Sequence, residues 1–441
     1  MAMSSEEMIE QCLAHNLFSW SATDTVKPLP LARAEGVWLY APDGRRWLDF
    51  NSLLMSVNIG HGHPHVIRAI QRQAETLCFA HPSFATEIRA RVSSRLAKLV
   101  PGDLNTFFFT LGGAEANENA IRAVRQFTGR PKILARYRSY HGATHGALSL
   151  TGEPRGWHAG ARMPGVVHVL DPDPYDYAFG DDEESRTRNN LRYLEEVIRA
   201  EGPHTIAAMF IETVTGTNGI LPPPKGYLRG LKSLLERYDI LLVCDEVMAG
   251  WGRTGRRFAF EHGDIVPDIV TMAKGLTSSY MPLGVMGVSD RIAAHFRENT
   301  FFGGLTYNAH PMSLAAADAV MDVFEEEQLI EKSARMGEVM RGHMKRLAER
   351  HPSVLEHRNL GLFGAIELRR NARGERLVPF GGAHPAMGRL LSFLREEGLF
   401  TVAQWSTLMC NPPLCISEEE LQLAFDIIDR GLEITDEAFG D

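Results

Sequence analysis

The sequence predicts an α/β fold in which a large, mostly parallel sheet with covering helices is followed by a smaller α+β domain. From about residue 105 to 290, short apolar runs alternate with amphipathic segments, as in parallel strands buried on both faces. After residue 310 the pattern changes to long charged amphipathic segments, which are typical of helices on a small sheet. The length of 441 residues exceeds what a single core usually fills, so two domains or one large α/β domain are expected.

Seven apolar runs predict the strands of the large sheet: NTFFFT, KILAR, VVHVLD, TIAAMFIET, DILLVCDEV, DIVTMAKGL and LGVMGVSD. Between the fourth and the fifth run, the segment GYLRGLKSLLERYD predicts a helix. One face of that helix collects the apolar side chains that a βαβ crossover buries: Leu228, Leu231, Leu234, Leu235 and Tyr238.

The two ends of the chain predict smaller elements. EGVWLYAPDGRRWLDF predicts two aromatic strands joined at the turn pair Asp43 and Gly44. Near the other end, residues Gly361 to Leu368 predict a strand, and SEEELQLAF opens a last helix with Ser417 and Glu420 in capping-box spacing. We expect three parts: an N-terminal segment 1–60 that packs with the small domain, a large ligand-binding domain 61–311, and a small C-terminal domain 312–441.

Composition narrows the range of functions. A net charge of −9, with no basic run beside an aromatic stripe, argues against nucleic-acid binding and favours small-molecule partners. The acidic start MAMSSEEMIE has no apolar signal segment, and no run is long enough to span a membrane. Five scattered cysteines without paired spacing predict reduced thiols in a cytoplasmic protein: Cys12, Cys78, Cys244, Cys410 and Cys415.

Three places carry residues suited to chemistry. In FFFTLGGAEANENAIRAV a strand ends at Thr110, Gly112 and Gly113 form a turn, and a helix begins near Ala114. Backbone N–H groups at such a helix start converge on an anion, although a glycine turn also serves plain strand-to-helix connections. The run matches neither the nucleotide P-loop nor the dinucleotide fingerprint.

The second and third places are strand ends. ILLVCDEV delivers Asp245 and Glu246 at the edge where open α/β sheets bind ligands, and an Asp there can also simply cap a helix. DIVTMAKGL ends with Lys274. An amine, a carboxylate and an anion cup at one sheet edge are what a pyridoxal phosphate enzyme needs: the amine forms a Schiff base, the carboxylate keeps the pyridine nitrogen protonated, and the cup holds phosphate.

Longer motifs make the resemblance specific. The chain contains VNIGHGHP from Val57, GGAEANENAIRAVR, YHGAT from Tyr140, DEVMAGWGRTG, MAKGL around Lys274, GLTYNAHP, and NPPL from Asn411. In this order they resemble the class III, or omega-type, aminotransferases of the fold type I pyridoxal phosphate family, over nearly the whole chain. The resemblance implies pyridoxal 5'-phosphate as cofactor and transamination by a ping-pong mechanism through a Lys274 aldimine.

The resemblance also assigns cofactor contacts. Lys274 and Asp245 become the catalytic pair, and the backbone of Gly113 and Ala114 becomes the phosphate site. Family members often carry a hydroxyl group where this chain has Ala114. The resemblance further implies that Tyr140 stacks on the cofactor ring, that His141 after it also contacts the cofactor, and that Val247 packs on the opposite ring face. Glu212 is expected to support Asp245. Thr306 is expected to reach into the site of the neighbouring subunit. A homodimer with shared sites is therefore expected, and pairing of dimers into tetramers stays open.

The histidines of HGHPH, which are His61, His63 and His65, suggest a metal site at first sight. Their alternate spacing lacks the helical i, i+4 arrangement, and no acidic or cysteine ligands cluster beside them. The run resembles the entry loop of the same family. We therefore expect no metal.

Substrate preference is predicted from missing residues. The ornithine and 4-aminobutyrate members pair a glutamate with an arginine before PPL, whereas here ETVTGTNG carries Thr217 at that place and no arginine lies between Glu396 and Pro412. YHGAT also has Ala143 where an arginine is common, so other groups must recognise a carboxylate. An arginine outside these motifs, such as Arg155 or Arg253, is the alternative source of charge for the second carboxylate of 2-oxoglutarate. An apolar substrate site is expected from Phe18, Trp20, Leu54, Met55 and Trp405.

ETVTGTNGILPPPKGYL is most similar to the taurine, β-alanine and amine branch of the family. We therefore expect an omega-amino donor and pyruvate as the acceptor. The alternatives are 2-oxoglutarate as acceptor, or another pyridoxal phosphate reaction such as an aminomutase, racemase or decarboxylase. A cofactor-free binding protein and a degenerate NTPase are disfavoured by the intact Lys274 and Asp245.

Overall fold

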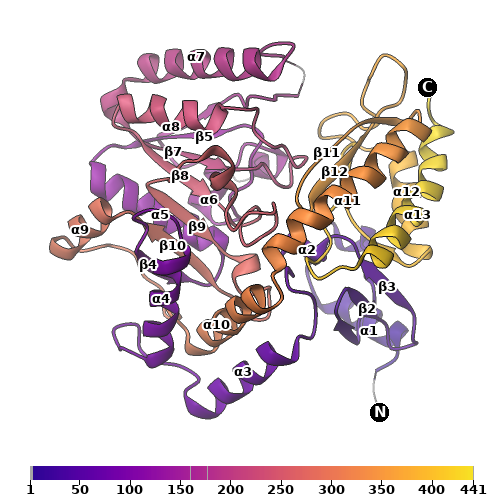
Figure 1. Ribbon diagram of the computed structural model, residues 1–441, viewed down its shortest axis with the longest axis horizontal. Helices are drawn as coiled ribbons and strands as arrows, with labels where there is room; N and C mark the ends of the chain where they lie inside the picture. The colour runs from indigo at the N-terminus through magenta and orange to yellow at the C-terminus, as the bar shows by residue number, and fades with distance from the viewer. Residues whose placement is uncertain (1–2, 159, 176, 441) are drawn as a thin grey trace.

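A seven-stranded sheet forms the centre of the larger part of the computed structural model, which describes residues 3–158, 160–175 and 177–440 (Figure 1). Across the sheet the strands are β4 (Thr106–Thr110), β10 (Gly284–Val288), β9 (Ile269–Met272), β8 (Leu241–Asp245), β7 (Ile206–Glu212), β5 (Lys132–Arg136) and β6 (Val166–Val169). The five strands from β9 to β6 run parallel. All seven predicted runs are strands, and the predicted α/β class with a mostly parallel sheet is confirmed.

Strand β10 departs from the parallel arrangement, because it pairs antiparallel with both β4 and β9. Every residue of β10 is buried, as is every residue of the parallel strands β9 and β8. An apolar run records burial on both faces and carries no sign of direction, so the sequence could not reveal this reversal.

Helices cover both faces of the sheet, and strand β7 shows how its residues divide between them. Met209 and Ile211 join a buried cluster with helices on one face, whereas Ala208 and Phe210 join a second cluster on the other face. The first set of helices is α4 (Glu87–Leu99), α7 (Glu183–Glu201) and α8 (Tyr227–Arg237). The second set is α5 (Gly113–Thr128), α6 (His145–Leu150) and α9 (Asp290–Glu298).

Helix α8 follows the predicted pattern and buries four of the five expected side chains, Leu228, Leu231, Leu234 and Leu235. The fifth, Tyr238, is the residue at the C-cap, and its hydroxyl donates to Glu195 at the surface of α7. A tyrosine at the end of a helix keeps its polar tip accessible, which explains this exception. No helix in the part of the chain that the structure describes has the length and apolar character to cross a membrane.

The C-terminal part combines long helices with a second sheet and ends on helix α13. Its helices are α10 (Pro311–Glu326), α11 (Leu329–Arg350), α12 (Pro385–Glu396) and α13 (Glu418–Asp436). The sheet has the order β11 (Val354–Leu360), β12 (Phe363–Leu368), β15 (Thr407–Cys410) and β14 (Ala403–Gln404). The predicted strand at 361–368 corresponds to β12, and the predicted capping box of Ser417 and Glu420 opens α13. Three strands were missed, because β14 and β15 are short and β11 carries charged residues on its exposed face.

The N-terminal residues build a third, small sheet of β1 (Arg33–Glu35), β2 (Trp38–Tyr40), β3 (Arg46–Asp49) and β13 (Leu399–Phe400). As predicted, β2 and β3 form a hairpin, and Gly44 supplies the positive φ of 87° in its turn. β3 pairs with β13 from the far end of the sequence, and Phe50 packs edge-on against Phe425 of α13. Three further helices precede the large sheet: α1 (Ser5–His15), α2 (Ser52–Met55) and α3 (Pro64–Thr76). The domain boundaries at residues 60 and 311 stay predictions.

Arg253 joins segments that are distant in sequence. Its side chain is fully buried and donates hydrogen bonds to the carbonyl groups of Leu362 and Pro412. It also donates to Oγ of Ser52 at 2.9 Å and to Oδ1 of Asn58 at 3.0 Å. A guanidinium group committed to four acceptors in this way is a structural cross-link, and it is not available to bind a substrate carboxylate.

Replacing Arg253 with methionine would leave several buried acceptors without donors. We expect Arg253→Met to lower the free energy of unfolding by roughly 3 kcal/mol, measured by urea titration. The matched control is Arg188→Met, because Arg188 makes only an exposed i, i+4 pair with Glu184. Equal urea midpoints for the two variants would contradict the cross-linking role.

Candidate active site

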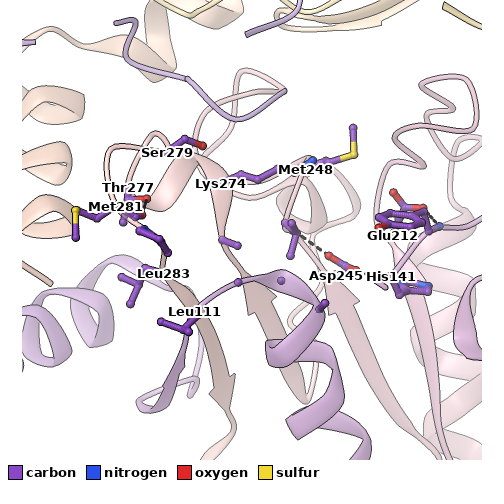
Figure 2. Close-up of a pocket in the computed structure, with 18 residues that line it drawn as sticks. Leu111, His141, Glu212, Asp245, Met248, Lys274, Thr277, Ser279, Met281 and Leu283 are labelled. Carbon is purple, nitrogen blue, oxygen red and sulfur yellow. Dashed lines mark hydrogen bonds and ion pairs between the residues drawn. The ribbon is translucent and has the colours of Figure 1, made fainter. Parts of the chain in front are cut away.

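A cavity of about 400 Å³ opens where β7, β8 and β9 end and α5 begins (Figure 2). This is the edge at which open α/β sheets bind ligands. Eighteen residues line it: Leu111, Gly112, Gly113, Ala114, Tyr140, His141, Gly142, Glu212, Asp245, Val247, Met248, Ala273, Lys274, Thr277, Ser279, Met281, Pro282 and Leu283. Eight of the nine residues expected to contact the cofactor are among them, and the ninth is Thr306.

The start of α5 forms one wall of the cavity. Gly112 is its N-cap, and the N–H groups of the first turn, from Gly113 and Ala114 onward, point out of the helix end where an anion is favoured. A Cβ atom added to Gly113 would lie 2.7 Å from Cγ2 of Val247. The glycine therefore allows the helix end to approach the loop after β8, which a larger residue would push away.

Asp245 is buried at the end of β8 and is held by three neighbours. Its Oδ2 atom lies 2.8 Å from Nδ1 of His141 and 2.8 Å from Nδ2 of Asn117, and its Oδ1 atom accepts from the N–H of Val247 at 3.0 Å. Thr271 in turn donates to Oδ1 of Asn117 at 2.8 Å. This network stabilises the negative charge of the carboxylate and fixes its direction.

Asn117 and Thr271 were missed in the sequence analysis. Asn117 lies on the first turns of α5 within the motif GGAEANENAIRAVR, and Thr271 lies in β9 within TMAKGL. Both belong to motifs whose predicted roles rest on other residues, namely Gly113 and Ala114 in the first motif and Lys274 in the second. Their role became visible only when α5 and β9 were placed beside β8.

Glu246 follows Asp245 but faces away from the cavity. Its two carboxylate oxygens accept from the N–H groups of Ala259 and Phe260 at 2.8 and 2.9 Å. Burial raises the pKa of Glu246 to about 7. Of the acidic pair at this strand end, only Asp245 is directed at the ligand site.

Lys274 lies two residues beyond the end of β9, in a short 3-10 turn, Lys274–Leu276. Its φ of 44° is a left-handed conformation that a lysine rarely adopts, and such strain is common at functional positions. Burial lowers the pKa of its amine to about 8, against the opposing effect of Glu212 and Asp245. Figure 2 shows Lys274 extending into the cavity, so a nucleophilic amine is available there near neutral pH.

Glu212 lies opposite Asp245 in the pairing of β7 with β8. Its carboxylate accepts from the N–H of Tyr140 at 2.8 Å and from the N–H of Gly216 at 2.9 Å. Burial raises its pKa to about 7. Glu212 therefore acts on the site by holding two loops, and its hydrogen bonds go to these loops and not to Asp245.

The residues expected to line the substrate site lie outside the cavity in the single chain. Trp20 comes nearest, with its ring edge-on to Tyr140 at a centroid distance of 6.4 Å. Met55 is buried in a cluster that includes Met248, and Trp405 packs on Tyr175. Leu54 is exposed and Phe18 is half-buried. These positions stay predictions as substrate contacts.

Arg155 lies beside this aromatic pair. Its guanidinium carbon is 3.8 Å from the centroid of Tyr140 and 5.5 Å from that of Trp20. Because Tyr140 lines the cavity and Arg253 is locked into the core, Arg155 is the better placed of the two arginines expected to meet a substrate carboxylate.

The three histidines of HGHPH are directed at three different carboxylates. His61 pairs with Asp49 at 2.8 Å, His63 with Glu327 at 2.9 Å, and His65 with Asp322 at 2.9 Å. Among the described residues no group of three or more possible ligands is arranged to hold a metal ion. These histidines tie the entry loop to neighbouring elements.

The fold and the site together define a class of enzyme. An amine, a buried carboxylate and a helix N-terminus meet at the carboxyl edge of a mostly parallel sheet, and this is the equipment of a pyridoxal-phosphate-dependent enzyme. The residues fit that cofactor: the helix end suits its phosphate, Asp245 suits its ring nitrogen, and Lys274 suits its aldehyde.

The chain belongs to the class-III aminotransferases, since the sequence model of that family matches residues 20–432. An omega-aminotransferase of Caulobacter vibrioides is 32% identical over 424 residues, which cover 92% of this chain and 93% of the relative. The structure of taurine:2-oxoglutarate aminotransferase from Bifidobacterium kashiwanohense, in complex with pyridoxal phosphate and glutamate, superposes with a TM-score of 0.96 at 36% identity over 99% of both chains. An (S)-enantioselective omega-transaminase from Thermomicrobium roseum superposes with a TM-score of 0.94 at 36% sequence identity. The match covers 99% of this chain and 100% of that one. The protein is thus a pyridoxal-phosphate-dependent transaminase.

We expect cofactor-free protein to capture pyridoxal phosphate covalently at Lys274, faster at pH 9 than at pH 6. The protonated amine is not a nucleophile, and its pKa of about 8 places the change within this range. Borohydride trapping followed by peptide mapping measures the adduct. Lys274→Ala should lose adduct and turnover, whereas Lys345→Ala, at an exposed lysine, should keep both. An adduct on another lysine, or a rate independent of pH, would contradict the assignment.

Proposed function

We propose that this transaminase takes an amino group from an omega-amino donor, such as taurine, β-alanine or another primary amine, and passes it to pyruvate in a ping-pong reaction. The observation that carries the proposal is the single cationic group of Arg155 beside the cavity-lining ring of Tyr140. It is supported by the similarity to an omega-aminotransferase and to a taurine aminotransferase. A cytoplasmic location is part of the same proposal.

The proposal gives each residue at the sheet edge a role. The N–H groups of Gly113 and Ala114 would hold the phosphate, and Tyr140 and Val247, which line the same cavity, would pack on the ring. Asp245 holds a proton at the ring nitrogen, and His141 and Asn117 orient its carboxylate. When bound, the cofactor supplies an electron sink for the carbon that carries the amino group.

Lys274 has two tasks in this scheme. Its Nζ atom anchors the cofactor, and after release it takes a proton from the amino-bearing carbon of the donor and returns it on the cofactor side. A buried amine with a pKa of about 8 is matched to this transfer at neutral pH. The strained φ of 44° fixes the backbone from which the side chain reaches into the cavity.

The acceptor follows from charge. Pyruvate has one carboxylate, for which Arg155 is sufficient, whereas 2-oxoglutarate brings a second carboxylate that needs its own partner. Thr217 contacts Met248 through its hydroxyl group, where other branches of the family place a glutamate. The Bifidobacterium relative is named for 2-oxoglutarate, so a comparison of the two acceptors tests this part of the proposal directly.

We expect kcat/KM for pyruvate to exceed that for 2-oxoglutarate by about tenfold or more at one saturating donor, because an unpaired buried carboxylate loses a charge-assisted hydrogen bond. A donor panel of taurine, β-alanine and benzylamine tests the omega-amino part. Arg155→Gln should raise KM for pyruvate, while Arg237→Gln, an exposed arginine remote from the cavity, should leave it unchanged. A clear preference for 2-oxoglutarate would overturn the acceptor proposal.

We also propose a homodimer in which Thr306 completes the phosphate site of the other subunit. Thr306 is exposed and does not line the cavity of its own chain. Several large apolar side chains are exposed in the same chain: Phe79, Phe84, Phe302 and Tyr307. Exposed apolar groups of this size are typical of a surface that another subunit covers.

Mixed dimers test the shared site. Lys274→Ala and Thr306→Asp should each be severely impaired, the second because a carboxylate repels phosphate. In a heterodimer of the two variants, one of the two sites combines the intact Lys274 with the intact Thr306, so mixing should restore activity. Full activity of Thr306→Asp, or no recovery on mixing, would contradict a shared site.

A further inference from the structure

Glu153 is a buried carboxylate beside the active site that the reaction scheme does not use. Its side chain is only 1% exposed, and it directly precedes the short 3-10 turn Pro154–His158 that carries Arg155. Oε1 of Glu153 accepts from Nε of Arg155 in a very short contact. Burial raises the pKa of Glu153, and Arg155 opposes that rise. The structure thus places the carboxylate of Glu153 against the guanidinium group of Arg155, which in the proposed function binds the acidic group of the substrate.

One edge of the Arg155 guanidinium group is hydrogen-bonded, and another has an N–H group without a partner among the described residues. Its Nε edge faces Glu153, and its guanidinium plane lies over the ring of Tyr140. Nη2 of Arg155 is buried and has no hydrogen-bond partner among the described residues. An unpaired buried N–H group of a charged side chain is costly, and it is satisfied when an acidic group of a ligand arrives.

The pair meets two kinds of substrate differently. An uncharged or purely apolar group beside Tyr140 meets a guanidinium whose charge Glu153 already balances, so no isolated charge is left in a dry site. A carboxylate or sulfonate binds the free Nη2 edge but shares the cation with Glu153, and the repulsion between the two anions weakens its binding. The same pair of charges therefore meets both kinds of group.

We propose that Glu153 is a positioning residue that sets the balance between acid-bearing and uncharged substrates by partly neutralising Arg155. This inference rests on the proposed function, in which Arg155 binds the acidic group. A transaminase binds its amino donor and its keto acid in the same pocket, one after the other. In this inference, Glu153 lets that pocket bind both acid-bearing and uncharged groups.

Steady-state kinetics of the holoenzyme test the balance, with β-alanine and benzylamine as acid-bearing and uncharged donors at saturating pyruvate. Glu153→Gln keeps a hydrogen-bond acceptor for Nε and removes the charge. We expect KM for β-alanine to fall and KM for benzylamine to rise, each by about three- to tenfold, with kcat within about twofold of wild type. Glu153→Asp, which keeps the charge, should retain the wild-type preference.

Two further variants separate this role from a structural one. Glu367→Gln removes a carboxylate that is equally buried against Arg358 and lines no part of the cavity, so the ratio of the two KM values should not change. The double variant with Glu153→Gln and Arg155→Gln should match Arg155→Gln alone, since Glu153 acts through Arg155. This comparison also works if Glu153→Gln folds poorly by itself.

If Glu153→Gln raises KM for β-alanine and lowers it for benzylamine, or shifts both KM values in the same direction by the same factor, the inference is overturned. Additive effects in the double variant would overturn it as well. If Arg155→Gln raises KM for acid-bearing substrates while Glu153→Gln changes nothing, the proposed function stands and only the role of Glu153 fails. If Arg155→Gln leaves the preference for the two donors unchanged, the substrate role of Arg155 itself is wrong.

Discussion

The structure depends on keeping opposite charges buried side by side at the carboxyl edge of the large sheet. The carboxylate of Asp245 is stabilised by His141, Asn117 and the N–H of Val247, and the amine of Lys274 lines the same cavity. Neither group would tolerate such burial alone, since a desolvated charge costs several kcal/mol. The strand β8, the start of α5 and the loop that carries His141 are arranged so that the carboxylate of Asp245 has partners on more than one element.

Close backbone approach is the second condition, because it brings those elements together. Gly113 leaves room for Val247, and Gly142, with a φ of 131°, lies where a Cβ atom would come within 2.6 Å of the backbone of Ala114. The same packing involves Ala114, where members of the family often carry a residue with a hydroxyl group. The small side chain there suits the approach of the Gly142 loop. In the proposed function it leaves phosphate binding to backbone N–H groups.

The residues that we propose to meet the substrate or complete the neighbouring site lie on segments that are less regular than the sheet. Arg155 belongs to a short turn, Trp20 to the N-terminal segment, and Thr306 to an exposed loop before α10. Loops on a rigid sheet can vary without disturbing the catalytic centre, which is the usual division between chemistry and recognition in α/β enzymes. The similarity to enzymes named for different amines is understandable in these terms.

The sequence by itself determined the α/β class, the seven strands of the large sheet, the capping box of α13 and the residues that enter the cavity at strand ends. These follow from local patterns: apolar runs, turn residues and polar side chains placed just after a strand. The tertiary structure alone decided the reversal of β10, the burial of Arg253 as a cross-link, the recruitment of Asn117 and Thr271 to Asp245, and the placement of Arg155 over the ring of Tyr140. Each of these depends on which surfaces of distant elements meet, and burial and partnership are properties of that meeting, which no local pattern records.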